Sequence, residues 1–547
     1  MSRGVAVAIG ALIVGLFSAV ASRGLSHQGL LYHDTGSYLL EAKFLREGLD
    51  ALLTVNLRDG RQPGFWNAMK SRFSGTPLHT GKAGFSAVLC LAGSLVGFSD
   101  NVCAYVTVLS SIAGLCLTFC IARKLGDFSC AVYATAALAS STFYLMYARS
   151  GLADAVVTLW FLAGLLLYLV WKNSPRRSVA FAVGLCFGLV FCTNQWRSAY
   201  MPACLLAVDG LTAWQERWRW KFFLSRLIFA SLGFLTPLIA FQMPYVAARA
   251  LAGPLPFPDF WSQLAERFTT REGLEWFGGF SEMSVSIWNV EGPMLPLLTL
   301  AAWGFLIIRW LRKREAKDVQ LLAFSLLPFL YFSSVKWHGE TLPRTIASVL
   351  PVMALGVGEM LGALQKTLRS RFHLSGRQDL VLLTALTSAI LTWNLPRSCA
   401  DGITSSGYSE ASRFLSATSK KSFMILGMEP VWRFYLGKMA YEPYARPTSL
   451  QELVTRAEAG GVEHVVVDFS TLYSKYGMEY TWAVAHNIKP LATFANPRGA
   501  SLPYLLDIYG WKRAREVAAD PLSAKILIFS IKEIRKWVDR RNAQLIS

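Results

Sequence analysis

The chain of 547 residues gathers its apolar residues into long blocks, and this pattern constrains the fold more than any other feature. Twelve blocks can be read, at roughly 4–22, 84–99, 101–122, 128–147, 151–171, 178–193, 199–213, 222–241, 293–308, 319–335, 345–365 and 379–394. A helix of roughly 20 apolar residues crosses a bilayer. Hydrophobic residues make up 53% of the chain and charged residues 16%, whereas soluble domains carry about 25% charged residues. The pattern excludes a soluble globular, disordered or disulfide-rich secreted protein and predicts a polytopic α-helical membrane protein.

The basic residues predict how the chain crosses the membrane, because Lys and Arg collect in cytoplasmic loops. Five basic clusters lie between the blocks, at 123–124, 176–177, 217–221, 312–314 and 369–377. With the N-terminus cytoplasmic, all five are cytoplasmic if block 84–99 does not span, and all five are outside if it does. We therefore expect about eleven transmembrane helices and a juxtamembrane helix at 84–99. The clusters also explain the net charge of +19, so we expect no nucleic-acid partner.

This topology divides the chain into two predicted domains. Residues 1–395 would form a transmembrane catalytic domain, with 4–22 retained as an anchor and a large first outward loop at 23–100. Residues 396–547 would lie outside, as a small α/β domain with strands near 423–426, 465–467 and 526–529. A helix at 449–459 is expected, because Ser449 can cap its start and glycines follow its end.

Two outward segments carry carboxylates at the membrane surface. The first loop contains His33, Asp34 and Tyr38 at the start of an amphipathic segment, 37–48. Asp34 is either a functional carboxylate or a helix-entry residue. A short turn between two spans contains Arg149 and Asp154, which would form a structural ion pair or shape a site; an Asp at a helix start also suits the helix dipole.

Several cations and histidines face outward as well. Lys336, His338 and Arg344 stand between two late spans, against the positive-inside trend, and indicate an anionic ligand or contact with lipid headgroups. Arg197 is a further outward cation or an interfacial anchor. His79, in the segment 77–82, is a solvated loop residue or a weak candidate metal ligand. Cations and carboxylates together suit chemistry on a lipid phosphate, in which cations hold the departing phosphate and a carboxylate activates or orients an acceptor hydroxyl.

Over residues 1 to about 395 the chain resembles the GT-C superfamily of glycosyltransferases that use polyprenyl-phosphate sugars. The resemblance is greatest to protein O-mannosyltransferases and lipid A aminoarabinose transferases. Four motifs carry it, in order along the chain: Asp34, Tyr38, Ala42 and Gly48 in the first loop; a Pro-containing juxtamembrane segment at 77–98; Tyr147, Arg149 and Asp154; and Ser333 or Ser334 with Lys336, Leu342, Pro343 and Arg344.

The resemblance implies roles for these residues. Asp34 would be the base or the carboxylate that orients the acceptor, and Asp154 and Arg149 would shape the site. Lys336 and Arg344 would bind the lipid phosphate. Some relatives place a metal-binding acid near the position of His79. The chain has Asp34-Thr35 where many protein mannosyltransferases have Asp-Glu, and it lacks the Trp-Trp-Asp motif of oligosaccharyltransferases.

The sequence therefore predicts an inverting glycosyltransferase of the cell inner membrane, with its N-terminus cytoplasmic and its C-terminal domain periplasmic or extracellular. It would move one sugar from a polyprenyl-phosphate carrier to a lipid, glycan or protein hydroxyl at the outer face. A transporter or flippase of a lipid-linked or anionic substrate is the first alternative. A catalytically inactive membrane receptor that binds through its C-terminal domain is the second.

Overall fold

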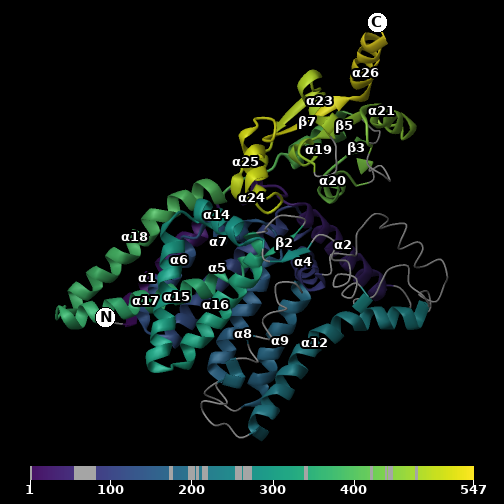
Figure 1. The fold of residues 1–547 in the computed structure, drawn as a ribbon. Helices are drawn as coiled ribbons and strands as arrows, with labels where there is room; N and C mark the ends of the chain where they lie inside the picture. The colour runs from purple at the N-terminus through teal and green to yellow at the C-terminus, as the bar shows by residue number, and fades with distance from the viewer. Residues whose placement is uncertain are drawn as a thin grey trace.

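The computed structural model describes residues 3–54, 82–171, 176–194, 204, 208–211, 220–252, 261–262, 274–276, 278–337, 343–418, 423–437, 440–441, 447–474 and 479–546. Figure 1 shows a bundle of helices with an α/β region, coloured light green to yellow, against one end. The principal bundle helices are α1 (Arg3–Ser22), α2 (His33–Thr54), α4 (Ala83–Val96), α5 (Val102–Leu125), α6 (Phe128–Ala139), α7 (Thr142–Arg149), α8 (Asp154–Trp171), α9 (Arg177–Thr193), α12 (Trp220–Ala252), α14 (Phe280–Glu291), α15 (Met294–Lys313), α16 (Ala316–Ser334), α17 (Leu350–Arg371) and α18 (Gly376–Gly402).

Within the described residues, five helices are long and apolar enough to cross a membrane: Gly4–His27, Val102–Leu125, Phe223–Met243, Met294–Lys313 and Gly376–Gly402. The bent pair α6 and α7 adds a sixth if it is one span, and α4, α9 and most of α8 are shorter apolar helices. A mostly helical chain with several candidate spans is therefore confirmed. The expected number of eleven is not confirmed, and block 199–213 lies largely outside the described residues.

A buried carboxylate creates the bend of 65° between α6 and α7. Glu291 accepts hydrogen bonds from the Ser141 hydroxyl at 2.7 Å and from the backbone N–H groups of Thr142 and Phe143 at 2.9 Å each. These groups would otherwise lack partners at the start of α7, and the negative charge complements the helix dipole. Glu291 therefore fixes the start of α7, which ends at Arg149 beside the first loop.

Buried ion pairs join four helices at the side of the bundle away from the α/β region. Arg309 Nε lies 2.9 and 3.0 Å from the two carboxylate oxygens of the fully buried Asp318. Arg309 Nη2 also lies 3.0 Å from Glu359 Oε2, which is 3.2 Å from Lys317 Nζ. Lys317 also donates to the carbonyl of Leu125, the last residue of α5. The ends of α5 and α15 and the start of α16 therefore meet the middle of α17 here, next to the basic clusters at 123–124 and 312–314.

The C-terminal α/β region contains a sheet of five strands in the order β4-β3-β5-β7-β6. Strands β3 (Phe423–Ile425), β5 (His464–Val467) and β7 (Lys525–Ser530) lie where the sequence predicts strands, and β4 (Ala440–Tyr441) and β6 (Ala492–Ala495) complete the sheet. Strand β3 is parallel to β4 and β5, whereas β7 is antiparallel to β5 and β6. The Ser449 side chain caps α21 (Leu450–Ala459) as expected. Helix α18 continues past the predicted boundary at 395, so the exact domain division stays a prediction.

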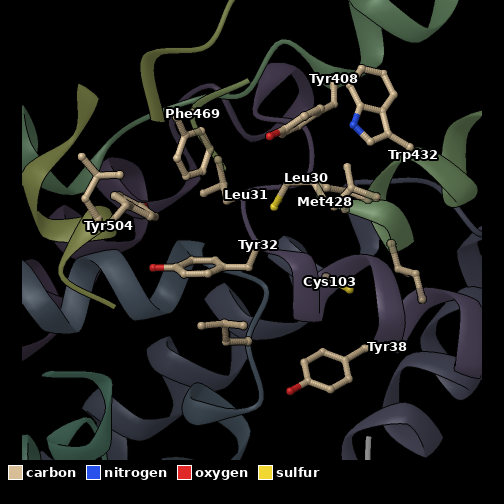
Figure 2. Packing of buried hydrophobic residues seen from close by; sticks show 14 of the residues in the cluster. Leu30, Leu31, Tyr32, Tyr38, Cys103, Tyr408, Met428, Trp432, Phe469 and Tyr504 are labelled. Atoms are coloured by element: carbon tan, nitrogen blue, oxygen red, sulfur yellow. The ribbon is translucent and has the colours of Figure 1, made fainter. Parts of the chain in front are cut away.

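A short extended segment of the first loop lies between the bundle and this region. Leu30, Leu31 and Tyr32 are at most 3% exposed. Figure 2 shows them surrounded by Tyr408, Trp432, Phe469 and Tyr504 of the α/β region and by Cys103 and Tyr38 of the bundle. The first loop is therefore part of the junction between the two parts of the chain, and Asp34 follows it directly.

The ion pairs at the far end of the bundle predict a stability effect. Asp318→Asn removes the charge that Arg309 binds with both oxygens and leaves a buried cation partly uncompensated. We expect a loss of about 3 kcal/mol in unfolding free energy, seen as a lower midpoint of thermal denaturation in detergent. Glu516→Gln, which removes an exposed partner of Arg513, is the control and should leave the midpoint unchanged. An equal effect of both substitutions would contradict the structural role of the pair.

Candidate functional site

Asp34 lies in the first turn of α2, where the first loop meets the junction. The Thr35 hydroxyl donates to the carbonyl of Ser150 at 3.3 Å. A Cβ on Gly36 would lie 2.6 Å from backbone atoms of Pro430 and Val431, so only a glycine allows α2 to approach α20 (Glu429–Leu436) so closely. The start of α2 is thus held from both sides, by the turn after α7 and by the α/β region.

Three cationic groups surround Asp34. Arg344 Nη1 lies 3.3 Å and Lys82 Nζ 3.6 Å from Asp34 Oδ2, and His33 Nδ1 lies 3.8 Å from Oδ1. His33 Nε2 is also 3.5 Å from Glu429 Oε2 of α20. The three cations therefore face two carboxylates, and the Asp34 side chain remains about one third exposed. Such a site favours an added anion.

These neighbours shift the ionisation of Asp34 and His33. Burial alone would raise the pKa of Asp34, but Lys82, His33 and Arg344 together hold that pKa well below its usual value. Burial would lower the pKa of His33, but its contacts with Asp34 and Glu429 raise it from 6.5 to about 9. At neutral pH Asp34 is therefore ionised and His33 carries a positive charge.

Tyr38 connects Lys82 to the helix that carries Asp34. The Lys82 ammonium donates to the Tyr38 hydroxyl, and the Tyr38 ring packs edge-on against Phe85 of α4, with ring centres 5.0 Å apart. One turn later, the Ser86 hydroxyl donates to Glu41 Oε2 at 2.6 Å. These contacts pair α2 with α4 and place the cation that precedes α4 beside Asp34.

Arg149 and Asp154 are both buried on either side of the turn that supports Thr35. Arg149 Nη1 donates to the carbonyls of Ala21 and Arg23 at 2.6 and 2.7 Å, and the Arg149 carbonyl accepts from the Gln28 side chain at 2.6 Å. These contacts hold Arg149 against the end of α1, and the role in shaping the site that the resemblance implies for Arg149 stays a prediction. Asp154 begins α8, where it suits the helix dipole, and its catalytic role stays a prediction.

Lys336 occupies a different place from Arg344, although the sequence grouped them. Lys336 lies in β2 (Val335–Trp337), which pairs with β1 (Leu274–Trp276), and its Nζ is 3.8 Å from Glu282 Oε2. Arg344 lies in the short helix η3 (Pro343–Ile346) and contacts Asp34. The structure therefore brings His33, Tyr38 and Arg344 together around Asp34, and pairs Lys336 with another acid. Three further candidates, His79, Arg197 and His338, lie outside the described residues.

Lys82, Glu429 and Asp507 each contact a residue of this site, and none of the three is among the candidate site residues predicted from the sequence. A local signal exists only for Lys82, a cation of the predicted outward loop that directly precedes an apolar helix. Glu429 and Asp507 come from the C-terminal region and reach the site only through folding. In the described part of the chain, no three His, Cys, Asp or Glu side chains gather as a metal site.

Comparisons with known proteins identify the fold. No protein-family model matches the chain, and no curated protein matches its sequence. Among solved structures, ArnT from Cupriavidus metallidurans bound to undecaprenyl phosphate is similar at a TM-score of 0.54 and 13% identity, over 95% of this chain and 97% of that one. The oligosaccharyltransferase of Archaeoglobus fulgidus tethered with an acceptor peptide is similar at 0.56 and 11% identity, over 88% and 71%.

The similarity to both structures covers most of this chain and defines its class: a polytopic membrane protein with the GT-C fold. ArnT and the archaeal oligosaccharyltransferase are two of the solved structures that share this fold. The likeness to GT-C proteins that the four motifs indicate is thereby confirmed at the level of the fold. At 11 to 13% identity, activity has to be argued from the site.

The ionisation of His33 predicts a pH dependence of stability. A raised folded-state pKa stabilises the fold fully below the ordinary pKa of 6.5, and that contribution is lost as the pH rises through about 9. The midpoint of thermal denaturation of the wild type should therefore exceed that of His33→Gln at pH 6.5 and equal it above pH 9. His486→Gln, in α23 (Glu479–Asn487), is the control and should show no such convergence. A constant gap between wild type and His33→Gln across this range would contradict the ion pairs of His33.

Proposed function

We propose that the protein is an inverting glycosyltransferase that moves one sugar from a polyprenyl-phosphate carrier to an acceptor hydroxyl at the outer membrane face. The observation that carries the proposal is the position of Asp34, with Arg344 at 3.3 Å and Lys82 at 3.6 Å. The reaction needs a carboxylate as base and cations for the phosphate, and this partly exposed site contains both. The solved ArnT structure holds undecaprenyl phosphate, and an archaeal oligosaccharyltransferase holds a dolichol-phosphate at a TM-score of 0.52 and 11% identity, which supports a lipid phosphate as the ligand.

In the proposed reaction, the acceptor oxygen attacks the anomeric carbon on the face opposite the phosphate. The new carbon–oxygen bond forms as the bond from the anomeric carbon to the phosphate oxygen breaks, so the configuration inverts. The bonding electrons leave with the phosphate, which Lys82 and Arg344 stabilise as its charge grows. The acceptor proton passes to Asp34. Phosphate leaves without protonation, so the departing side needs no general acid.

The charges around Asp34 also link donor binding to activation of the base. In the free site, Lys82 and Arg344 hold the pKa of Asp34 well below its usual value, and a carboxylate in that state is a weak base. A phosphate bound by the same two cations would compete for their charge, so the pKa of Asp34 would rise towards that of a useful base. Asp34 would then accept a proton efficiently only when the donor is present.

The remaining assignments belong to the same proposal. Asp154 would shape the acceptor side, and Lys336, His338 and Arg197 would contact the donor phosphate or lipid headgroups. The basic clusters at 123–124 and 312–314 adjoin the bundle end opposite Asp34, which supports a cytoplasmic N-terminus and an outward C-terminal region in the inner membrane. Residues 1–395 would carry catalysis, and residues 396–547 would cover the outer side of the site.

The first prediction of this proposal concerns the base. Asp34→Asn keeps the shape of the side chain but removes the proton acceptor, so sugar transfer should fall by about 10² to 10⁴-fold. Mass spectrometry of lipids, glycans and envelope proteins from cells expressing each form at matched levels would measure the sugar added. Asp401→Asn is the matched control, because it removes a partly exposed carboxylate of α18 that pairs with Arg397 and not with the site cations. A folded Asp34→Asn protein with wild-type transfer would refute the role of Asp34 as the base, whereas a wild type that adds no sugar to any fraction would favour a transporter or receptor.

A second prediction concerns the phosphate. Lys82→Met removes one charge-assisted contact worth about 1.5 to 3 kcal/mol, so the KM for the polyprenyl-phosphate sugar should rise about 10- to 100-fold. Initial rates of the purified protein at varied donor concentration would measure it. Lys43→Met is the control, because Lys43 of α2 stacks on Phe434, with its Nζ 4.2 Å from the ring centre. Equal KM values for Lys82→Met and wild type would contradict phosphate binding by Lys82.

A further inference from the structure

Asp507 is a buried carboxylate of the C-terminal region that contacts three separate parts of the bundle side. It lies between α24 (Leu502–Leu505) and α25 (Trp511–Ala519) and is 3% exposed. It accepts hydrogen bonds from the Tyr32 hydroxyl at 2.9 Å, the Arg344 backbone N–H at 3.0 Å and the Tyr147 hydroxyl at 3.3 Å. One side chain thus joins the first loop, η3 and α7.

Two of these donors flank the ion pair at the centre of the site. Tyr32 precedes Asp34 by two residues, and Arg344 holds Asp34 through its own Nη1 at 3.3 Å. Asp507 therefore contacts the backbone of Arg344 and the chain segment that leads to Asp34. A shift of Asp507 would change the separation of Asp34 and Arg344 without any change in either side chain.

A second residue of the same stretch holds Tyr32. Arg498, in the short helix η5 (Pro497–Ala500), is fully buried, and its guanidinium lies 4.7 Å from the centre of the Tyr32 ring and 4.8 Å from that of Phe469. Among the described residues, its three guanidinium nitrogens have no hydrogen-bond partner, and its charge lies over the two rings. A cation–π contact is strengthened when water is excluded from it, and this one fixes the Tyr32 ring whose hydroxyl reaches Asp507.

We propose that Asp507 is a positioning residue for sugar transfer, which holds Tyr32 and Arg344 so that Asp34 and Arg344 keep their catalytic geometry. The inference rests on the proposed glycosyltransferase function. It gives the C-terminal region a part in catalysis without contact with substrate. A misplacement of about 1 Å can cost 10²-fold in rate, so the loss of three hydrogen bonds around one carboxylate is enough for a large effect.

The test separates hydrogen-bond geometry from charge. Asp507→Ala removes all three contacts, and kcat should fall by about 10²-fold. Asp507→Asn keeps an oxygen that accepts from Arg344 and Tyr147, and its NH₂ group can donate to the Tyr32 hydroxyl, so it should recover most of the lost kcat. Asp520→Ala is the matched control: Asp520 accepts from Tyr473 in the same region, away from the first loop. It should match Asp507→Ala in expression and leave kcat unchanged.

The outcomes distinguish this inference from the proposed function. A wild type without transfer of any sugar refutes the proposed function itself. If the wild type is active and Asp507→Ala has the same kcat, only the positioning role is refuted. If Asp507→Ala does not fold, the double variant Tyr32→Phe with Tyr147→Phe decides, because it removes two hydroxyl donors and keeps both rings. A fall in kcat of about 10-fold supports the inference, and no change overturns it.

Discussion

The structure depends on burial of an irregular segment, residues 28–32, between the helical bundle and the α/β region. A segment without regular structure must find partners for its backbone groups elsewhere when it is buried. The Ser406 N–H donates to the Gln28 carbonyl at 2.8 Å, and the Leu30 N–H donates to the Tyr435 hydroxyl at 3.3 Å. The Gln28 side chain binds the carbonyl of Arg149. Both parts of the chain therefore fix this segment, and the segment fixes Asp34.

The charges at the site follow from this placement. Asp34 enters a region where Lys82, from the start of α4, and Arg344, from η3, converge. Glu429 adds a second carboxylate through His33. The free site is thus nearly balanced but keeps an excess of positive charge, which suits a ligand that brings its own negative charge. The cations that lower the pKa of Asp34 in the free site are the same ones that would stabilise a departing phosphate.

Much of the helical organisation could be predicted from the sequence, because hydrophobic blocks and caps are local signals. Block 101–122 became α5, and the Ser449 cap and the strands around 465 and 526 lie where the pattern places them. The number of transmembrane helices was harder to predict from the sequence. Block 128–147 reads as one apolar run, yet Glu291, far away in sequence, caps a new helix at Thr142 and bends the chain. The pattern of apolar residues within the block cannot predict that contact.

The sequence by itself determined that the chain is a helical membrane protein, and it selected Asp34, His33, Tyr38 and Arg344 as candidate site residues. It did so because topology follows from local hydropathy and charge, and one topology puts these residues on one membrane face. The tertiary structure decided which of the candidates meet. It paired Arg149 with the end of α1 and Lys336 with Glu282, and it brought Lys82, Glu429 and Asp507 to the site. These choices depend on contacts between residues up to 475 positions apart, which only the packing of the whole chain can specify.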